Sequence, residues 1–395
     1  MKTKFIRLLG ILLLISGCSN TTTSSEQPSL PSYTIKVIDI DGQELSCKNI
    51  EYNENSSVFE DLKANFNVNY TMDSYGPYLS SIDGSIVDSN YYLAIYQNNE
   101  PASTGVDGLK VKENDVFEFK VECWNTISSG YGTLDEYDLL VDKVIYGYMK
   151  TLDLSTSSTF MDSSFWDLMT IKVAKDNYYD SSIFNFDDIS NATKQEIESY
   201  DINNLKDSNL YKYYLYSKAL NKDLSALKTY AASYIETLSD EYNDYVSPFI
   251  VAASYGLNIT SSKIDTLVNK EISTNLMWGP DIPVWQYTTS KLYKNDIDNS
   301  TLNLCVEKLD YENSCSTSLV LQAFAAANEN IRDSKYELNG KDLIEVLFDN
   351  YYNESTNILE YTKGELNTFS ANQTIASLMA YKVCRDTGKA INIYG

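Results

Sequence analysis

Residues 116–124 read VFEFKVECW, an alternation of apolar and polar side chains. A period of two gives a β-strand one apolar face and one polar face, so this stretch predicts a half-buried strand. Near residue 130 the strand pattern stops, and helical periodicity continues almost to the last residue. The position of this change predicts a multidomain chain with a small α+β domain first and a larger helical domain after it.

The residues before the change predict a ubiquitin-like α+β domain over 33–126. Its first two runs are separated by Asp41-Gly42, a hairpin turn signal, although the alternation blurs at Val37-Ile38. A run with apolar residues on one helical face follows, and then three more extended runs. The expected elements are a hairpin, a short helix and three strands, at 33–40, 45–52, 57–66, 78–82, 91–96 and 116–124.

Beyond a linker at 127–136, residues 137–395 predict an α6/α6 barrel, or alpha-alpha toroid. Six apolar helical segments alternate with six amphipathic ones, as in stacked helical hairpins. The apolar set should form an inner ring, at 163–174, 210–220, 245–256, 283–293, 315–327 and 370–384. The amphipathic set should form an outer ring, at 137–152, 193–200, 224–238, 262–272, 301–309 and 341–351. An irregular helical bundle is the alternative, because the spacings vary.

The first residues predict export. Residues 1–18 combine a short basic region with an apolar run too short to span a bilayer, and end in Ile15-Ser16-Gly17-Cys18. This ending resembles the lipobox of bacterial lipoproteins, which implies that Cys18 is lipidated. A generic secretory signal with a chance cysteine is the alternative. Residues 19–32 are polar and suit a flexible tether, so we expect a lipid-anchored protein on the extracellular face of a bacterial membrane.

Composition limits the chemistry. The chain has no histidine, which excludes Ser-His-Asp and Cys-His nucleophiles, histidine-ligated zinc and an imidazole base. Its formal net charge of -24 argues against binding of nucleic acid. Of the five cysteines beyond Cys18, at least one must stay unpaired, and Cys47 with Cys123 is the first pair to test.

Several spaced segments carry a family resemblance. They read YGPYLSSIDG at 75–84, YYLAIYQN at 91–98, GVD at 105–107 and KENDVFEF at 112–119. They resemble the β domain of the transcobalamin and intrinsic factor family of cobalamin carriers. The helical repeats resemble that family's α6/α6 barrel of the prenyltransferase type, and NQTIASLMAY at 372–381 resembles its last repeat. The domain order is reversed relative to the animal carriers.

The resemblance implies a corrinoid, such as cobalamin, bound between the two domains and over the open end of the barrel. A corrin ring calls for aromatic walls and a few amide, hydroxyl and backbone partners. On the β domain, the loop from 75 to 78 and two residues of the following strand would face the ligand. On the barrel, residues near the starts of the inner helices are candidates. The expected contacts are Tyr75, Gly76, Pro77, Tyr78, Tyr92, Ala94, Trp166, Tyr211, Trp278, Trp285, Gln286, Asn372 and Gln373.

Several of these residues have structural alternatives. Trp166 and Trp285 could belong to the core, and Asn372 and Gln373 could cap the last helix. Gln286 is the barrel residue we favour most, and Tyr91 and Leu93 are expected in the core. Because no histidine can ligate cobalt, recognition would rest on shape and amide contacts, with no protein ligand to the metal.

The expected function is non-enzymatic capture of a corrinoid and its delivery to a membrane transporter. The alternative is a surface protein of the same architecture that binds a glycan, a peptide or another protein. A terpene-cyclase-like enzyme is the least favoured reading, because Asp39-Ile40-Asp41 and Asn185-Phe186-Asp187-Asp188 match the acidic motif of the cyclases neither in sequence nor in position.

Overall fold

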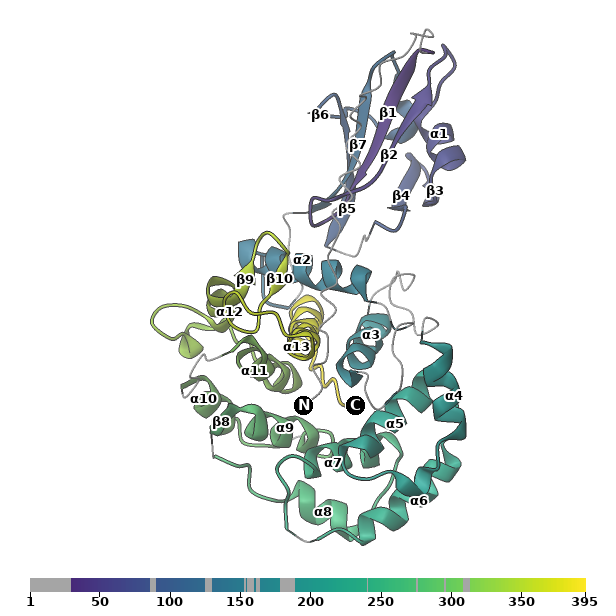
Figure 1. Ribbon diagram of the computed structural model, residues 1–395. Helices are drawn as coiled ribbons and strands as arrows, with labels where there is room; N and C mark the ends of the chain where they lie inside the picture. Colours follow the sequence, from purple (N-terminus) through teal and green to yellow (C-terminus); the bar gives the residue numbers. More distant parts are fainter. Residues whose placement is uncertain are drawn as a thin grey trace, which may run out of the picture.

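The computed structural model consists of a small sheet domain followed by a helical domain (Figure 1). It describes residues 30–85, 90–124, 130–152, 154, 160, 164–177, 189–239, 241–274, 276–294, 296–307 and 313–395, apart from the side chains of 277, 278 and 369. The expected mixed α and β organisation is confirmed, with the last strand of the sheet domain ending at Cys123 and the next helix starting at Glu136. The proposed signal, Cys18 and nearly all of the tether lie outside the described residues.

The sheet domain contains a five-stranded sheet, a two-stranded sheet and one helix. The five strands have the order β2-β1-β7-β5-β6, in which β1 and β7 are parallel and the other pairs are antiparallel. The two-stranded sheet is the hairpin of β3 and β4. The elements are β1 Ser32–Ile38, β2 Glu44–Glu51, α1 Val58–Asn65, β3 Val68–Asp73, β4 Gly76–Ile82, β5 Tyr91–Gln97, β6 Glu100–Pro101 and β7 Val116–Cys123.

One apolar face of the five-stranded sheet forms the core of this domain. In β1, Tyr33, Ile35 and Val37 are buried, and the register shifts between Val37 and Ile38, where the sequence alternation also blurs. Ser57 caps α1, which buries its apolar face, as predicted. The sequence did not predict β3, because all but one of its residues are exposed and they show no apolar alternation.

The helical domain contains all twelve helices that the sequence predicts. The more buried set is α3 Phe165–Asn177, α5 Ser208–Ala219, α7 Ser247–Gly256, α9 Asp281–Ser290, α11 Ser314–Ala327 and α13 Thr368–Thr387. The amphipathic set is α2 Glu136–Thr151, α4 Asn191–Ser199, α6 Ser225–Glu236, α8 Ser262–Val268, α10 Ser300–Glu307 and α12 Leu343–Tyr351. Short strands β8 Met277–Pro280, β9 Tyr352–Asn353 and β10 Ile358–Leu359 lie between them.

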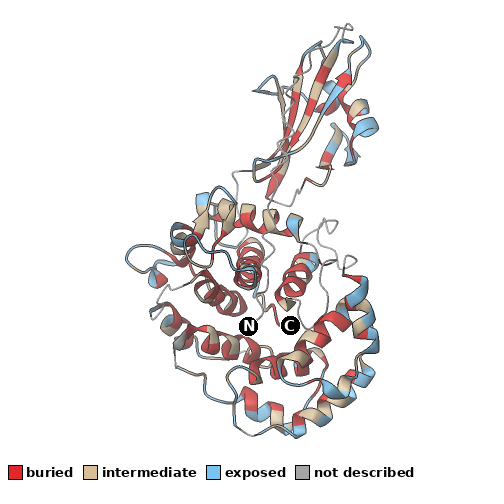
Figure 2. Cartoon of the chain, viewed as in Figure 1, coloured by how far each residue is buried: buried red, intermediate tan, exposed pale blue. Residues whose placement is uncertain are grey.

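The six more buried helices pack against one another in chain order, and α13 also packs against α3. They therefore close a circle, which we call the helical ring (Figure 1). Figure 2 shows that these helices are mostly buried, whereas α4, α6 and α8 expose much of their outer surface. Close packing fixes single residues: a Cβ added to Gly256 of α7 would lie 2.3 Å from the Tyr214 ring of α5, so this contact requires glycine.

The segment 389–395, which follows α13, enters the ring. Figure 1 places the last residue near the middle of the circle of helices. Tyr394 is buried there, donates a hydrogen bond to Gln322 Oε1 at 3.1 Å, and packs its ring against Trp166, Tyr211 and Phe249. The interior of the ring is therefore filled by the chain itself, up to the first turns of α3 and α7.

The sheet domain meets the helical domain at α2. Tyr91 donates a hydrogen bond to Asp142 Oδ2 at 2.6 Å and places its ring edge against Tyr146. Lys150 of α2 pairs with Asp39 in the turn after β1. In Figure 1 the sheet domain extends away from the ring from this contact. Within the described residues, no helix combines the length and apolar character needed to cross a membrane.

Candidate functional site

The first turns of the inner helices gather at one end of the helical ring. Phe165 of α3 lies 5.7 Å from Phe249 of α7, measured between ring centroids, and Phe249 lies 5.4 Å from Trp285 of α9. Near the start of α13, Asn372 contacts Asp167 in the first turn of α3. We call this the N-terminal end of the ring. It is opposite the end from which residues 389–395 enter, since those residues follow the C-terminus of α13.

Three N–H donor groups at the N-terminal end, in addition to hydroxyls such as those of Ser164 and Thr374, lack hydrogen-bond partners among the described residues. They are Trp166 Nε1 on α3, Trp285 Nε1 on α9 and Gln373 Nε2 on α13. Buried donors are nearly always satisfied in folded proteins, so each of them calls for an explanation. A ligand with several hydrogen-bond acceptors on its rim would supply the missing partners.

Tyr148, Asp167 and Asn372 form a second polar group at this end. Tyr148 of α2 donates to Asp167 Oδ1 at 3.0 Å and also contacts Asn372 Oδ1, while Asn372 Nδ2 donates to Asp167 Oδ2 at 3.1 Å. Burial raises the pKa of Asp167 to about 7, although the hydrogen bond from Tyr148 acts in the opposite direction. Asn367, not Asn372 or Gln373, caps α13, so the capping alternative for those two residues is wrong.

Two candidate ligand contacts predicted from the sequence, Gln286 and Tyr211, form hydrogen bonds to other parts of the protein instead. The Gln286 side chain accepts from the Ser273 backbone at 2.8 Å and donates to the Glu271 carbonyl at 2.9 Å, so it fixes the segment after α8. Tyr211 is buried and donates to the carbonyl of Tyr394 at 3.2 Å. Neither side chain presents a polar group to the N-terminal end. The backbone of Trp278 lies in β8, and its side chain lies outside the described residues.

On the sheet domain, the hairpin of β3 and β4 exposes aromatic surface. The loop expected at 75–78 is wrong, because residues 76–78 belong to β4 and pair with β3. Tyr75 is 94 % exposed, and Tyr78 is also exposed, whereas Pro77 is half-buried. Gly76 has a φ of +114°, and a Cβ there would lie 2.9 Å from a carboxylate oxygen of Asp107. The positive φ therefore favours glycine at this position, and any other residue would also displace the Asp107 carboxylate.

Tyr92 and Ala94 lie on the face of β5 opposite Tyr91 and Leu93, as expected. Tyr92 stacks on Trp124 with ring centroids 4.2 Å apart and donates to Glu122 Oε2 at 3.2 Å. Ala94 is buried. The described contacts do not bring these residues to the N-terminal end of the ring, so the sequence-predicted set divides between two places.

Three residues that sequence reasoning missed contribute to the ring site. Asp167 and Tyr148 lie in segments read as helical, but only their meeting with Asn372 across three helices reveals their role. Tyr394 follows the last helical pattern and carries no signal beyond its apolar ring. Asp167, a charged residue next to Trp166 in the mainly apolar first two turns of α3, was the one detectable sign.

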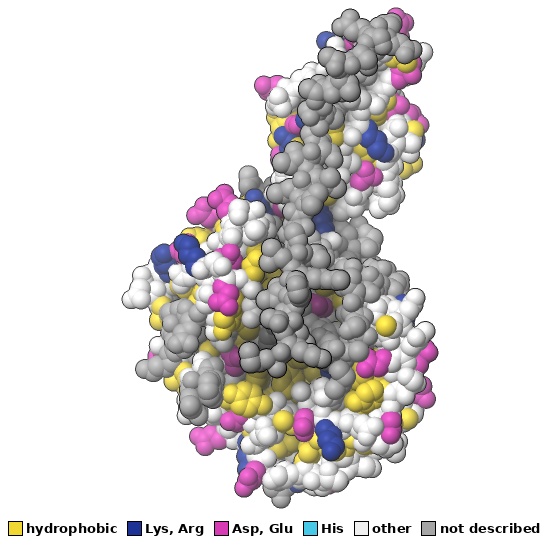
Figure 3. All heavy atoms as spheres, viewed as in Figure 1, with side chains coloured by type: hydrophobic (Ala, Val, Ile, Leu, Met, Phe, Trp, Pro, Cys, Tyr) yellow, Lys and Arg dark blue, Asp and Glu magenta, His cyan; other side chains and the backbone are white. Residues whose placement is uncertain are grey.

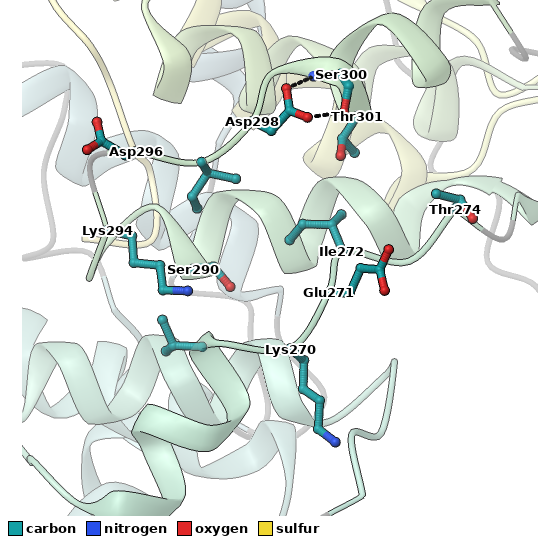
Figure 4. Close-up of a pocket in the computed structure, with 12 residues that line it drawn as sticks. Lys270, Glu271, Ile272, Thr274, Ser290, Lys294, Asp296, Asp298, Ser300 and Thr301 are labelled. Atoms are coloured by element: carbon teal, nitrogen blue, oxygen red, sulfur yellow. Dashed lines mark hydrogen bonds between the residues drawn. The ribbon is translucent and has the colours of Figure 1, made fainter.

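Two surface cavities lie elsewhere. One, of about 300 Å³, opens beside α8, α9 and α10, where lysine and acidic side chains of opposite charge line it together (Figure 4). Asp298 in its wall accepts hydrogen bonds from the backbone and the hydroxyl of Ser300 at the start of α10. The other, of about 520 Å³, lies at the C-terminal ends of α3 and α5. Neither contains a candidate from the sequence.

The described residues contain no group of three or more Cys, Asp or Glu side chains that could hold a metal ion. Cys47 and Cys123 are not joined by a disulfide. Figure 3 shows acidic side chains scattered over both domains, consistent with the net charge of -24.

Comparisons with known proteins reach only the sheet domain by sequence. Residues 55–122 match a family described as a domain of unknown function, DUF4430. No curated protein matches the chain. Among solved structures, the chain is similar to a candidate metal-binding protein from Ruminococcus gnavus ATCC 29149, at 21 % identity over 24 % of this chain and 97 % of that one. The TM-score is 0.22, which is too low to assign a shared fold.

Proposed function

We propose that this protein is a lipid-anchored binding protein that captures a corrinoid at the N-terminal end of its helical ring. In this proposal the ring is an α6/α6 toroid and the sheet domain is of the transcobalamin type. The observation that carries the proposal is the set of three donors without partners, Trp166 Nε1, Trp285 Nε1 and Gln373 Nε2, on three different inner helices at one end.

The chemistry of these donors fits a corrin. The periphery of the corrin macrocycle carries amide side chains whose carbonyl oxygens accept hydrogen bonds, and the faces of the macrocycle are wide and apolar. Phe165, Phe249 and Trp285 supply aromatic surface at the same end. Because Tyr394 fills the interior as far as Trp166, a ligand here would lie across the end of the ring. A flat, broad molecule suits that position better than a long, thin one.

The protein would hold the ligand without bonding to its metal. The sequence has no histidine, so no imidazole can ligate cobalt. Recognition would then depend on hydrogen bonds and apolar contact, and the corrinoid would keep its own axial ligands. Release to a membrane transporter would need no change in cobalt coordination.

Gel filtration tests the proposal. The purified protein is mixed with cyanocobalamin, free ligand is removed, and the visible spectrum of the protein fraction is recorded. A red protein fraction at micromolar concentration is expected. A colourless fraction would reject corrinoid binding.

Variants test the site. Trp285→Phe and Gln373→Leu remove one donor each with little change in shape, and each should weaken binding about tenfold, the value of roughly one hydrogen bond. Trp124→Phe on the sheet domain and Gln195→Leu on the exposed surface of α4 are matched controls that should bind as the parent does. Equal retention by all four variants would place the ligand elsewhere.

The hairpin of β3 and β4 favours a second candidate function. Tyr70, Met72, Tyr75 and Tyr78 are all exposed, and aromatic surface of this kind also binds sugars. If cyanocobalamin is not retained, a glycan array probed with the protein should give signals that Tyr75→Ala abolishes. Absence of any signal would remove this candidate as well.

A further inference from the structure

Tyr148, Asp167 and Asn372 form a closed circle of three contacts. Tyr148 Oη lies 3.0 Å from Asp167 Oδ1, Asn372 Nδ2 lies 3.1 Å from Asp167 Oδ2, and the Tyr148 hydroxyl contacts Asn372 Oδ1. The three side chains come from α2, α3 and α13. Asp167 and Asn372 are both more than nine-tenths buried.

Each of the three contacts needs one hydrogen atom. Tyr148 supplies one from its hydroxyl, and the Asn372 amide supplies one, because only its NH₂ group can donate. The third must come from the carboxyl of Asp167, which when protonated donates to Tyr148 Oη while the tyrosine hydroxyl donates to Asn372 Oδ1; Tyr148 donates to Asp167 when that carboxyl is ionised. The count is the same if the oxygen and nitrogen of the Asn372 amide are exchanged, because one amide atom still faces each neighbour. With a neutral carboxyl, every donor in the circle meets an acceptor.

An ionised Asp167 would leave one contact without a hydrogen. Two oxygen acceptors would then face each other in a buried site, at the cost of an unsatisfied polar group. Within the described part of the chain, no lysine or arginine pairs with Asp167. Its polar contacts are Tyr148 from α2 and the amide of Asn372 from α13, while Lys150 of α2 pairs with Asp39 instead.

We infer that Asp167 is a neutral carboxylic acid below neutral pH, and that its loss of a proton at higher pH weakens ligand capture at the N-terminal end of the ring. Asp167 and Asn372 are the direct sequence neighbours of two residues that would donate to the ligand. Asp167 follows Trp166 in α3 and Asn372 precedes Gln373 in α13, so the circle fixes the two turns that carry two of the three unpartnered donors. This second half rests on the proposed function.

The state of the carboxyl is tested without ligand. Infrared spectra of the full protein are compared with those of Asp167→Asn and of Asp176→Asn, an exposed carboxylate on the same helix that pairs with Lys172. At pH 6 the parent and Asp176→Asn should show a protonated-carboxyl band that Asp167→Asn lacks, and the band should fade by pH 8. A parent spectrum without that band at pH 6 would overturn the inference.

The effect on binding is tested with cyanocobalamin at pH 6 and pH 8. The affinity of the parent and of Asp176→Asn should fall by about threefold to tenfold at the higher pH, the effect of losing one hydrogen bond. Asp167→Asn carries its own NH₂ hydrogen and should bind equally at both values. A parallel fall in all three proteins would overturn the role of Asp167. No binding by any protein, with the infrared band present, would reject the proposed function while leaving the neutral carboxyl in place.

Discussion

At the level of single residues, the backbone conformation at residue 76 favours glycine over any other residue. Its φ is +114°, and an added Cβ would lie 2.9 Å from a carboxylate oxygen of Asp107. Gly76→Ala should therefore lower the free energy of unfolding of the sheet domain by about 1–3 kcal/mol. Chemical denaturation followed by circular dichroism measures this change.

Gly105→Ala is the matched control for that substitution. Gly105 has a φ of -63°, and an added Cβ would meet nothing closer than 3.4 Å. Its cost should stay below about 0.5 kcal/mol. Equal losses in the two variants would contradict the strain assigned to residue 76.

Two glutamines show the limit of sequence reading at this scale. Gln286 stands in an apolar segment and looks like an exposed polar group of a site, yet two backbone groups of the segment after α8 occupy its amide. Gln373 lies in a similar pattern, and its Nε2 has no partner among the described residues. Periodicity places both on inner helices, but the direction and neighbours of each side chain depend on tertiary packing.

At the scale of elements, a buried ion cluster joins α2 to α13. Arg385 donates to Asp142 Oδ1 at 2.7 Å and contacts Asp138, while Lys382 lies 3.3 Å from Asp142. All four side chains are buried. Because the sheet domain also contacts Asp142 through Tyr91, this cluster supports the junction of the two domains.

Removal of one cation from this cluster should be costly. Arg385→Met would leave the buried carboxylates short of positive charge, so we expect a loss of about 3–5 kcal/mol in the free energy of unfolding. Urea denaturation measures it. Lys335→Met, which breaks an exposed pair with Glu329, is the control and should unfold as the parent does. A loss from Arg385→Met no larger than that of the control would show that the cluster contributes little.

Helices and strands could be predicted from the sequence where their burial gives the apolar residues a regular spacing. The twelve helices of the helical domain follow from apolar runs in the more buried set and from amphipathic periodicity in the other, and the hairpin of β1 and β2 follows from the alternation in β1 and the turn signal after it. The strand β3 is mostly exposed and left no such pattern. Residues 389–395 are held by contacts with α5, α9 and α11 and have no period of their own.

At the scale of the whole molecule, Tyr91 fixes the sheet domain to the helical domain. Its hydroxyl donates to Asp142, which keeps Arg385 and Lys382 as partners if the tyrosine is changed. Tyr91→Phe should therefore cost about 1.5–3 kcal/mol, the value of a hydrogen bond to a charged group. The cost should appear as faster hydrogen exchange in α2 near Asp142.

Tyr92→Phe is the control for the domain contact. The Tyr92 hydroxyl bonds to Glu122 within the sheet domain, so its loss should leave exchange in α2 unchanged. Unchanged exchange in Tyr91→Phe too would mean that other contacts hold the domains together. The order and type of the two domains were predictable from the change of pattern near residue 130, but this contact was not, since it joins residues far apart in the chain.

In the proposed complex a corrinoid lies across the N-terminal end of the ring, against Trp166 and Trp285. Titration of the protein with cyanocobalamin, followed by tryptophan fluorescence, detects this contact. We predict saturable quenching with one ligand per protein, and a dissociation constant raised about tenfold by Trp285→Phe. A non-saturating decrease that is identical in the parent and in Trp285→Phe would contradict the claim.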